Sequence, residues 1–247
     1  SVKHASDIEL YSRMNIGEYW SCADRRSAVS ACYADDKRRA QQYENLVNGK
    51  SVLDIGCGAG GLLDILKPVT KSCAGVEPQE HVRRALQQDG HKVWASAEDI
   101  DEDCAYDVIT LFHVLEHLPR PIDTLTTLRK KLKPGGIIII EVPHANDFLL
   151  SFLDIIEFKR FTLWSQHLIL HTRNSLEKLV TISGFRNANI VGHQRYSIAN
   201  HMHWLRNKVP GGQAKWPELE NPKLHAEYES TLARMDMTDT ITCFARG

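Results

Sequence analysis

Short apolar runs alternate with amphipathic helical patterns through the central part of the chain. The apolar runs predict strands at about 51–55, 73–77, 92–95, 106–111 and 136–142. The amphipathic patterns predict helices near 60–66, 79–89, 121–132 and 173–183. Alternating strands and helices are typical of successive βαβ units, and nearly continuous apolar strands are typical of a sheet covered by helices on both faces. The pattern therefore predicts an α/β fold with a mostly parallel sheet.

Two further strands are expected near the C-terminal end. Gly184-Phe185 follows a helical pattern and is typical of a helix end that leads into a strand. The apolar residues of 239–245 predict the last strand. Before the repeating part, an amphipathic helix is predicted from Asp35 to Val47.

Three segments do not follow the strand–helix repeat: residues 1–48, 144–172 and 195–237. The second is rich in aromatic residues, and the third carries several histidines and tryptophans. In open α/β sheets, ligands bind beyond the carboxyl ends of the strands. We therefore read one domain over 1–247, with an N-terminal helical cap at 1–48, a ligand-binding core at 49–143 and substrate-side insertions at 144–172 and 195–237.

Composition excludes several classes of protein. The 30 Lys and Arg nearly balance the 31 Asp and Glu of the 247 residues, and no long run of one sign occurs, which argues against a nucleic-acid partner. No apolar run is long enough to span a membrane, and the N-terminus lacks the pattern of a signal peptide, so we expect a soluble, cytoplasmic protein. The six cysteines form no C-x-x-C pair, which argues against a thiolate zinc site.

A glycine-rich loop follows the first predicted strand. After Asp54 come Gly56, Gly58, Gly60 and Gly61, and glycine lets the backbone turn tightly and approach a ligand. Three of these glycines also match the dinucleotide fingerprint G-x-G-x-x-G, and Glu77 stands where a ribose-binding acid would be expected. The loop alone is therefore compatible with more than one nucleotide cofactor.

Three features favour a cationic cofactor over a dinucleotide. The charge of Asp54 is unfavourable beside a pyrophosphate but suits a ligand that carries an ammonium and a sulfonium. Glu77 ends a second strand, where a carboxylate can accept hydrogen bonds from both ribose hydroxyls. The stretches Asp107-Val-Ile-Thr-Leu-Phe-His-Val-Leu-Glu-His117 and Leu132-Lys-Pro-Gly-Gly136 follow in the order and spacing typical of methyltransferases.

Through these motifs, residues 50–143 resemble the core of class I S-adenosylmethionine-dependent methyltransferases. The resemblance implies a Rossmann-like, seven-stranded, mostly parallel sheet with strand order 3-2-1-4-5-7-6. It implies S-adenosylmethionine as methyl donor and S-adenosylhomocysteine as product. Three aromatic residues, Tyr19, Trp20 and Phe112, are able to face a sulfonium. The cofactor-binding residues that we expect are Tyr19, Trp20, Asp54, Gly56, Cys57, Gly58, Glu77, Pro78, Ala97, Glu98, Phe112 and His113.

A weaker resemblance concerns the acceptor. The stretches Asp147-Phe-Leu-Leu-Ser-Phe, Glu157-Phe-Lys-Arg-Phe-Thr-Leu-Trp-Ser-Gln-His167 and Arg195-Tyr-Ser-Ile-Ala-Asn-His201 are similar to bacterial methyltransferases of cell-surface polysaccharide and natural-product sugar modification. This resemblance implies a small-molecule, sugar-containing acceptor and a role in carbohydrate modification or polysaccharide biosynthesis.

Methylation of a sugar hydroxyl requires a general base, because the pKa of the hydroxyl lies far above neutral. Histidine suits this role, and His144, His167 and His113 follow elements that end at the expected pocket. Among them we rank His144 and His167 first, because cofactor packing also explains His113. No metal site is predicted, since neither His167 with His171 nor His201 with His203 has a carboxylate nearby in the sequence.

Three alternatives stay open at this point. The acceptor could be another small molecule, such as a quinone precursor, methylated at oxygen or carbon. The literal G-x-G-x-x-G match fits an NAD(P)-dependent oxidoreductase. The chain could also bind S-adenosylmethionine without turnover, as the partner of another methyltransferase.

Overall fold

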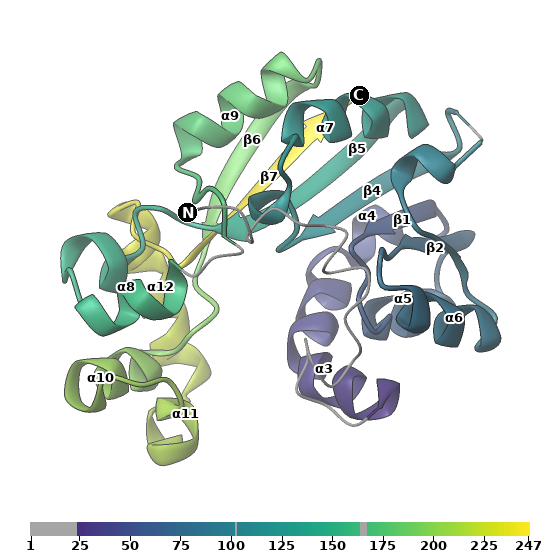
Figure 1. The fold of residues 1–247 in the computed structure, drawn as a ribbon. Coiled ribbons are helices and arrows are strands. Elements are labelled where there is room, and N and C mark those ends of the chain that lie inside the picture. Colours follow the sequence, from purple (N-terminus) through teal and green to yellow (C-terminus); the bar gives the residue numbers. More distant parts are fainter. Residues whose placement is uncertain (1–23, 102, 164–166) are drawn as a thin grey trace.

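The computed structural model describes residues 24–101, 103–163 and 167–247 (Figure 1). Two of the residues expected to bind the cofactor, Tyr19 and Trp20, lie outside this described part. Among the described helices, none combines the length and the apolar character that a membrane crossing requires.

A single seven-stranded sheet forms the centre of the molecule, in the order β3-β2-β1-β4-β5-β7-β6. Strand β7 is antiparallel to both of its neighbours, β5 and β6, and the other pairings are parallel. The strands are β1 Ser51–Ile55, β2 Ser72–Val76, β3 Lys92–Trp94, β4 Tyr106–Phe112, β5 Leu132–Pro143, β6 Arg186–His193 and β7 Thr240–Arg246. The predicted fold class and strand order are confirmed.

Helices cover both faces of the sheet, so the strands are apolar on both sides (Figure 1). The helices of the repeating unit and of the N-terminal part are α3 Arg25–Gln42, α4 Glu44–Val47, α5 Gly61–Leu66, α6 Glu80–Gln88, α7 Pro121–Lys131 and α9 Arg173–Ile182. On one face, Leu125 of α7 and Leu176 of α9 belong to the same apolar cluster as Ile109. On the other, Tyr43 and Leu62 join Val52 in a second apolar cluster.

Helix α3 begins ten residues before the helix predicted from Asp35 to Val47. The side chain of Asp24 caps it by accepting a hydrogen bond of 2.8 Å from the backbone N–H of Ser27. Most of the helix is polar, so hydrophobic periodicity could not reveal its first turns. The backbone leaves helical geometry at Tyr43, and α4 continues to Val47, the predicted end.

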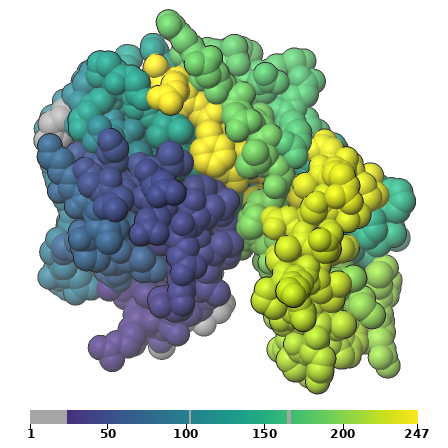
Figure 2. Space-filling model, turned by 180° about the vertical axis from the view of Figure 1, so that it is seen from behind, coloured from purple at the N-terminus to yellow at the C-terminus, as the bar shows by residue number. Residues whose placement is uncertain are grey.

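The segments outside the strand–helix repeat contain short helices. Residues 144–172 form a π-helical turn, η3 Phe148–Phe152, and the helix α8 Ile156–Thr162. Residues 195–237 form α10 Ile198–Asn207, α11 Gly212–Lys215, the 3-10 turn η4 Pro217–Leu219 and α12 Pro222–Arg234. These helices gather at one end of the sheet (Figure 1), and the surface is notched between α3 and the segment with α11 and α12 (Figure 2).

Ile109 offers a test of the core. It is fully buried at the centre of β4, whereas Ile182 at the end of α9 is 69% exposed. We expect Ile109→Ala to lower the free energy of unfolding by about 2–5 kcal/mol, because it removes buried apolar surface and leaves a cavity. The matched control Ile182→Ala should change it by less than about 0.5 kcal/mol. Chemical denaturation measures both, and equal losses would contradict this position of the core.

Candidate functional site

The candidate site lies at the carboxyl edge of the parallel strands. Strands β1, β2, β4 and β5 run in the same direction, so their last residues reach one edge of the sheet. The glycine loop follows β1, Glu77 follows β2 and His113 follows β4. Ligands of open α/β sheets bind at this edge.

The glycine loop is built on backbone conformations that other residues rarely adopt. Gly56, Gly58 and Gly60 have φ values of 68°, 52° and 77°. The carbonyl of Val76 accepts hydrogen bonds from the N–H groups of Gly56 and Cys57, at 2.8 and 3.0 Å. A Cβ atom on Gly56 would lie 2.4 Å from Cγ2 of Val114, so the loop packs directly against the residue that follows His113.

Glu77 is buried beneath this loop. One carboxylate oxygen accepts a hydrogen bond of 3.0 Å from the N–H of Gly58, and the other accepts one of 2.8 Å from the N–H of Gln79. The carboxylate therefore helps to shape the loop, and each of its oxygens can accept more than one hydrogen bond.

Two buried carboxylates flank the loop. Burial raises the pKa of Asp54 to about 7, although Oδ1 accepts a hydrogen bond of 2.6 Å from the hydroxyl of Thr110. Burial also raises the pKa of Asp36, on α3, to about 6. A Cβ atom on Gly61 would lie 2.3 Å from Oδ2 of Asp36, so this carboxylate lies directly against the loop. A cationic group bound at the loop would stabilise both carboxylates in their charged form.

The side-chain amide of Gln79 is fully buried, and neither of its polar atoms has a hydrogen-bond partner among the described residues. An unsatisfied buried amide is costly, so it is typical of a site completed by a ligand. The glycine turn, the strand-end carboxylates and this amide fit the ribose, ammonium and sulfonium of S-adenosylmethionine. They do not offer the positive charge that the pyrophosphate of a dinucleotide would favour.

The other predicted cofactor residues lie around the loop. Cys57 is buried against β2 and α6, and burial holds the pKa of its thiol well above the usual value, so it is a packing residue. Ala97 is buried in the 3-10 turn η1 Ala97–Asp99, whereas Glu98 is exposed. Phe112 stacks on Tyr43, with ring centroids 5.7 Å apart, and the guanidinium of Arg39 lies over its ring. Pro78 is half-buried between Glu77 and Gln79.

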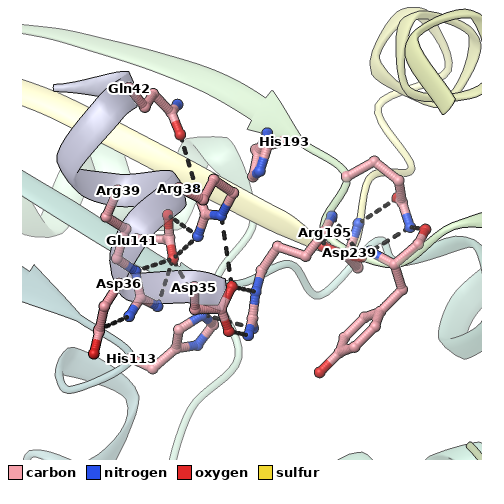
Figure 3. Close-up of polar contacts among 12 residues, drawn as sticks. Asp35, Asp36, Arg38, Arg39, Gln42, His113, Glu141, His193, Arg195 and Asp239 are labelled. Atoms are coloured by element: carbon pink, nitrogen blue, oxygen red, sulfur yellow. Dashed lines mark hydrogen bonds and ion pairs between the residues drawn. The ribbon is translucent and has the colours of Figure 1, made fainter. Parts of the chain in front are cut away.

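His113 lies in a network of buried charges (Figure 3). Its backbone has a φ of 55°, an unusual value for a residue other than glycine. Its Nδ1 lies 3.3 Å from Oε1 of Glu116, and its Nε2 lies 3.4 Å from Oε1 of Glu141. Arg195 donates a hydrogen bond of 2.9 Å to Nε2 and also pairs with Asp35 of α3. A proton taken up by His113 would therefore lie between two carboxylates.

Glu141 is the central group of this network, and the sequence pattern did not reveal it. Its side chain is fully buried near the end of β5 and accepts hydrogen bonds from Arg38 at 2.9 Å and Arg39 at 2.8 Å. Burial would raise the pKa of Glu141, but His113 and the two arginines hold it well below the usual value. The ion pairs attach helix α3 to the carboxyl edge of the sheet.

Glu116 is buried beside His113. With His117 it belongs to the 3-10 turn η2 Leu115–His117, and α7 starts later, at Pro121. A carboxylate oxygen of Glu116 and one ring nitrogen each of His117 and His167 lie within 4.8 Å of one another. Burial would raise the pKa of Glu116, but His113 and His117 lower it overall.

His144 and His167 differ in their surroundings. His144 is 1% exposed, its Nδ1 lies 3.1 Å from the carbonyl of Thr238, and burial lowers its pKa. His167 is half-buried, with Nδ1 2.7 Å from the carbonyl of Thr162, and burial lowers its pKa as well. The rings of His167 and His117 lie 5.0 Å apart. The structure thus brings His167 to Glu116 and encloses His144 between β5 and β7.

Comparison with known proteins identifies the domain. The methyltransferase domain family matches residues 25–190, more than half of the chain. The chain is 36% identical over 107 residues to the ubiquinone biosynthesis O-methyltransferase of Vibrio atlanticus (strain LGP32), covering 40% of this chain and 45% of that protein. The protein of the same name from Actinobacillus pleuropneumoniae serotype 5b (strain L20) is 31% identical over 111 residues, covering 40% and 47%. The chain thus spans less than half the length of these relatives.

Solved structures share the fold. A SAM-dependent methyltransferase from Archaeoglobus fulgidus aligns with a TM-score of 0.57 and 19% identity over 85% of this chain and 92% of that chain. The phosphoethanolamine N-methyltransferase 2 of Haemonchus contortus, in complex with S-adenosyl-L-methionine, aligns with a TM-score of 0.56 and 14% identity over 87% and 52%.

The raised pKa of Asp54 predicts a pH-dependent cost of folding. Because the folded pKa of about 7 exceeds the unfolded value of about 3.9, the folded state binds more protons between these values, and stability falls as the pH rises from about 4 to 7. Asp54→Asn keeps the acceptor for Thr110 and removes the charge. We expect it to stabilise the ligand-free protein by roughly 1–3 kcal/mol at pH 8 and much less at pH 5. Thermal unfolding at both pH values measures this, with Asp123→Asn on the exposed face of α7 as control; equal stability of variant and wild type at pH 8 would contradict the prediction.

Proposed function

The chain belongs to the methyltransferase domain family, and we propose that it transfers a methyl group from S-adenosylmethionine to a hydroxyl oxygen of a small molecule. The observation that carries the choice of oxygen is His113. Its imidazole lies between the buried carboxylates of Glu116 and Glu141, in the segment that packs against the glycine loop. An oxygen acceptor requires a base at this place, because a neutral hydroxyl is a weak nucleophile.

Different residues bind different parts of the methyl donor. Glu77 accepts hydrogen bonds from the ribose hydroxyls, Asp54 and Asp36 attract the cationic end, and the glycines admit the ligand close to the backbone. S-adenosylmethionine, when bound, supplies an electrophilic methyl group on a positively charged sulfur. Phe112, held by Tyr43 and Arg39, forms an aromatic wall beside this position.

His113 takes the proton from the acceptor hydroxyl at Nε2, where the hydroxyl replaces the hydrogen bond that Arg195 donates. As the proton moves to the imidazole, the acceptor oxygen forms a bond to the methyl carbon, the carbon–sulfur bond breaks, and its electron pair stays on sulfur as a neutral thioether. Glu116 and Glu141 stabilise the imidazolium that results, so the charge lost at sulfur is replaced by charge in a site that already contains two carboxylates. His144 and His167 remain the alternative bases, and we rank them below His113. His144 is almost fully enclosed, and His167 lies next to Glu116 and His117.

Two classes of acceptor have support. The ubiquinone biosynthesis O-methyltransferases among the relatives favour a phenolic hydroxyl of a quinone precursor. The resemblance of the insertions to sugar-modifying enzymes, together with the charged wall of Arg195, Glu141 and Asp35, favours a sugar hydroxyl. Both acceptors use the same base and the same transfer step.

Transfer of a labelled methyl group tests the function. Purified protein would be incubated with methyl-labelled S-adenosylmethionine and, separately, 3,4-dihydroxybenzoate and a panel of free and nucleotide-linked sugars. We expect the labelled methyl group to be bound to an oxygen of one class of acceptor. In calorimetry, we expect tight binding of S-adenosylhomocysteine and no binding of NADH. Label on nitrogen or carbon would contradict the choice of oxygen, and NADH binding without S-adenosylhomocysteine binding would favour an oxidoreductase. Binding of S-adenosylhomocysteine without transfer to any acceptor would favour a non-catalytic partner protein.

Glu77→Gln tests the ribose contact. We expect it to weaken the binding of S-adenosylhomocysteine by roughly 1–3 kcal/mol, because the neutral amide forms weaker hydrogen bonds and loses one acceptor. The control is Glu80→Gln, an exposed change at the start of α6 that should leave the affinity unaltered. Calorimetry measures both affinities, and an unchanged affinity of the Glu77 variant would rule out the assigned role.

His113→Asn tests the base. We expect kcat to fall by roughly 10²- to 10⁴-fold, as for the loss of a general base, while the affinity for S-adenosylhomocysteine changes little. His144→Asn, at the histidine enclosed between β5 and β7, is the matched comparison and should retain most of kcat. The opposite ranking of the two variants would transfer the role of the base to His144.

A further inference from the structure

We propose that Glu116, His117 and His167 bind a divalent transition-metal cation that holds the acceptor oxygen. The role of the cation at the acceptor rests on the proposed function, whereas the binding of the cation does not. The three residues come from two segments, the turn η2 and the loop after α8. Two imidazoles and one carboxylate are a common ligand set for zinc, iron and related metals.

The buried carboxylate of Glu116 is the first observation. Its side chain is fully buried, and neither oxygen has a hydrogen bond of normal geometry among the described residues. Nδ1 of His113 lies 3.3 Å from Oε1, and Nε2 of His117 lies 3.9 Å from it. A buried carboxylate without hydrogen bonds costs free energy, which a bound cation would repay.

The orientation of His167 is the second observation. Its Nδ1 lies 2.7 Å from the carbonyl of Thr162, which can only accept, so Nδ1 carries the proton and donates it. A second hydrogen bond of 2.9 Å, from the N–H of Leu168 to the carbonyl of Glu116, ties the loop to the turn η2. Metal-binding histidines usually donate one ring N–H to such a partner, and the other nitrogen binds the metal.

The distances are close to those of a metal site. Ligand atoms at about 2.0–2.2 Å from one tetrahedral ion lie roughly 3.4 Å from each other. The three ligand atoms lie within 4.8 Å of one another, so side-chain movements of roughly 1 Å would complete a tetrahedral site. Three protein ligands leave a further position open, as in catalytic zinc sites, and an acceptor oxygen can occupy it.

The position next to His113 determines what the ion would do. Glu116 contacts both the proposed base and the proposed metal, so the two act on the same acceptor. A metal-bound hydroxyl has a lowered pKa, which reduces the demand on the base. The two nitrogen ligands favour zinc, cobalt or iron over magnesium, calcium or manganese. The proton still leaves to His113, and the methyl group still moves from sulfur to oxygen.

The other histidines provide controls. His171 lies four residues after His167 in a backbone bridge with His144, and Ser175 lies 3.4 Å from its Nδ1. His201 contacts Tyr228 and Gln194, and His203 contacts the carbonyl of Val209. The pairs suggested by sequence spacing thus have other contacts, whereas His167 meets a carboxylate that is distant in the sequence.

Cobalt titration tests the proposal. Tag-free protein stripped of metal would be titrated with Co²⁺ and followed by visible absorption, and Zn²⁺ would compete for the same site. We expect about one equivalent to bind, and Glu116→Gln and His167→Gln to weaken the affinity roughly 10- to 100-fold or more. His171→Gln should bind Co²⁺ as the wild type does, and thermal unfolding would establish that each variant is folded. If a Glu116 or His167 variant fails to fold, His117→Gln, at a partly exposed position, replaces it.

The outcomes separate the two proposals. Absence of stoichiometric Co²⁺ and Zn²⁺ binding, or equal binding by wild type and all ligand variants, would overturn the metal site even if methyl transfer occurs. Metal binding by the wild type that is lost in these variants supports the site even if no acceptor is methylated. In that case only the proposed function is contradicted. Where an acceptor is methylated, equal turnover of metal-free and Zn²⁺-loaded protein would overturn the role of the ion at the acceptor oxygen.

Discussion

The buried carboxylate of Glu141 is the interaction on which the architecture of the site depends. It joins the end of β5 to two arginines of α3 and approaches His113, which follows β4. A fully buried charge of this kind is stable only with its partners, and loss of one partner typically costs about 3–5 kcal/mol. The ion pairs therefore hold α3, the cover of one side of the site, against the sheet edge. Arg195 extends the same network to the segment after β6, through its contacts with His113 and Asp35.

This network divides the carboxyl edge of the sheet into two regions of different charge. Beside the glycine loop, Asp54 and Asp36 are buried carboxylates whose pKa burial raises to about 7 and about 6, so this region favours a cation. Beyond His113, the carboxylate of Glu141 is paired with two arginines, whereas the carboxylate of Glu116 lies beside imidazoles. A sulfonium donor suits the first region, and an acceptor hydroxyl that loses its proton suits the second. The segment from Phe112 to Val114 joins them, because Val114 packs against the glycine loop and His113 approaches Glu116 and Glu141.

The strands and the position of the glycine loop could be predicted because they depend on local signals, and the strand order followed from the resemblance to a known family. Apolar runs marked the strands, and closely spaced motifs around Asp54, Glu77 and His113 indicated the family. Glu141 could not be found in this way. Its role depends on ion pairs with two arginines that lie about one hundred residues away in the sequence. The meeting of Glu116 with His167 is hidden for the same reason. The early start of α3 was missed because a polar helix has no apolar stripe.

A crystal structure of the protein with S-adenosylhomocysteine tests the central claim most directly. Our account predicts the ribose hydroxyls on Glu77, the amino group near Asp54, and the sulfur on the side of the loop that faces His113. Between sulfur and His113 there should be room for one acceptor oxygen in line with the lost methyl group. A ligand bound away from the glycine loop, or a sulfur separated from His113 by protein atoms, would contradict the account.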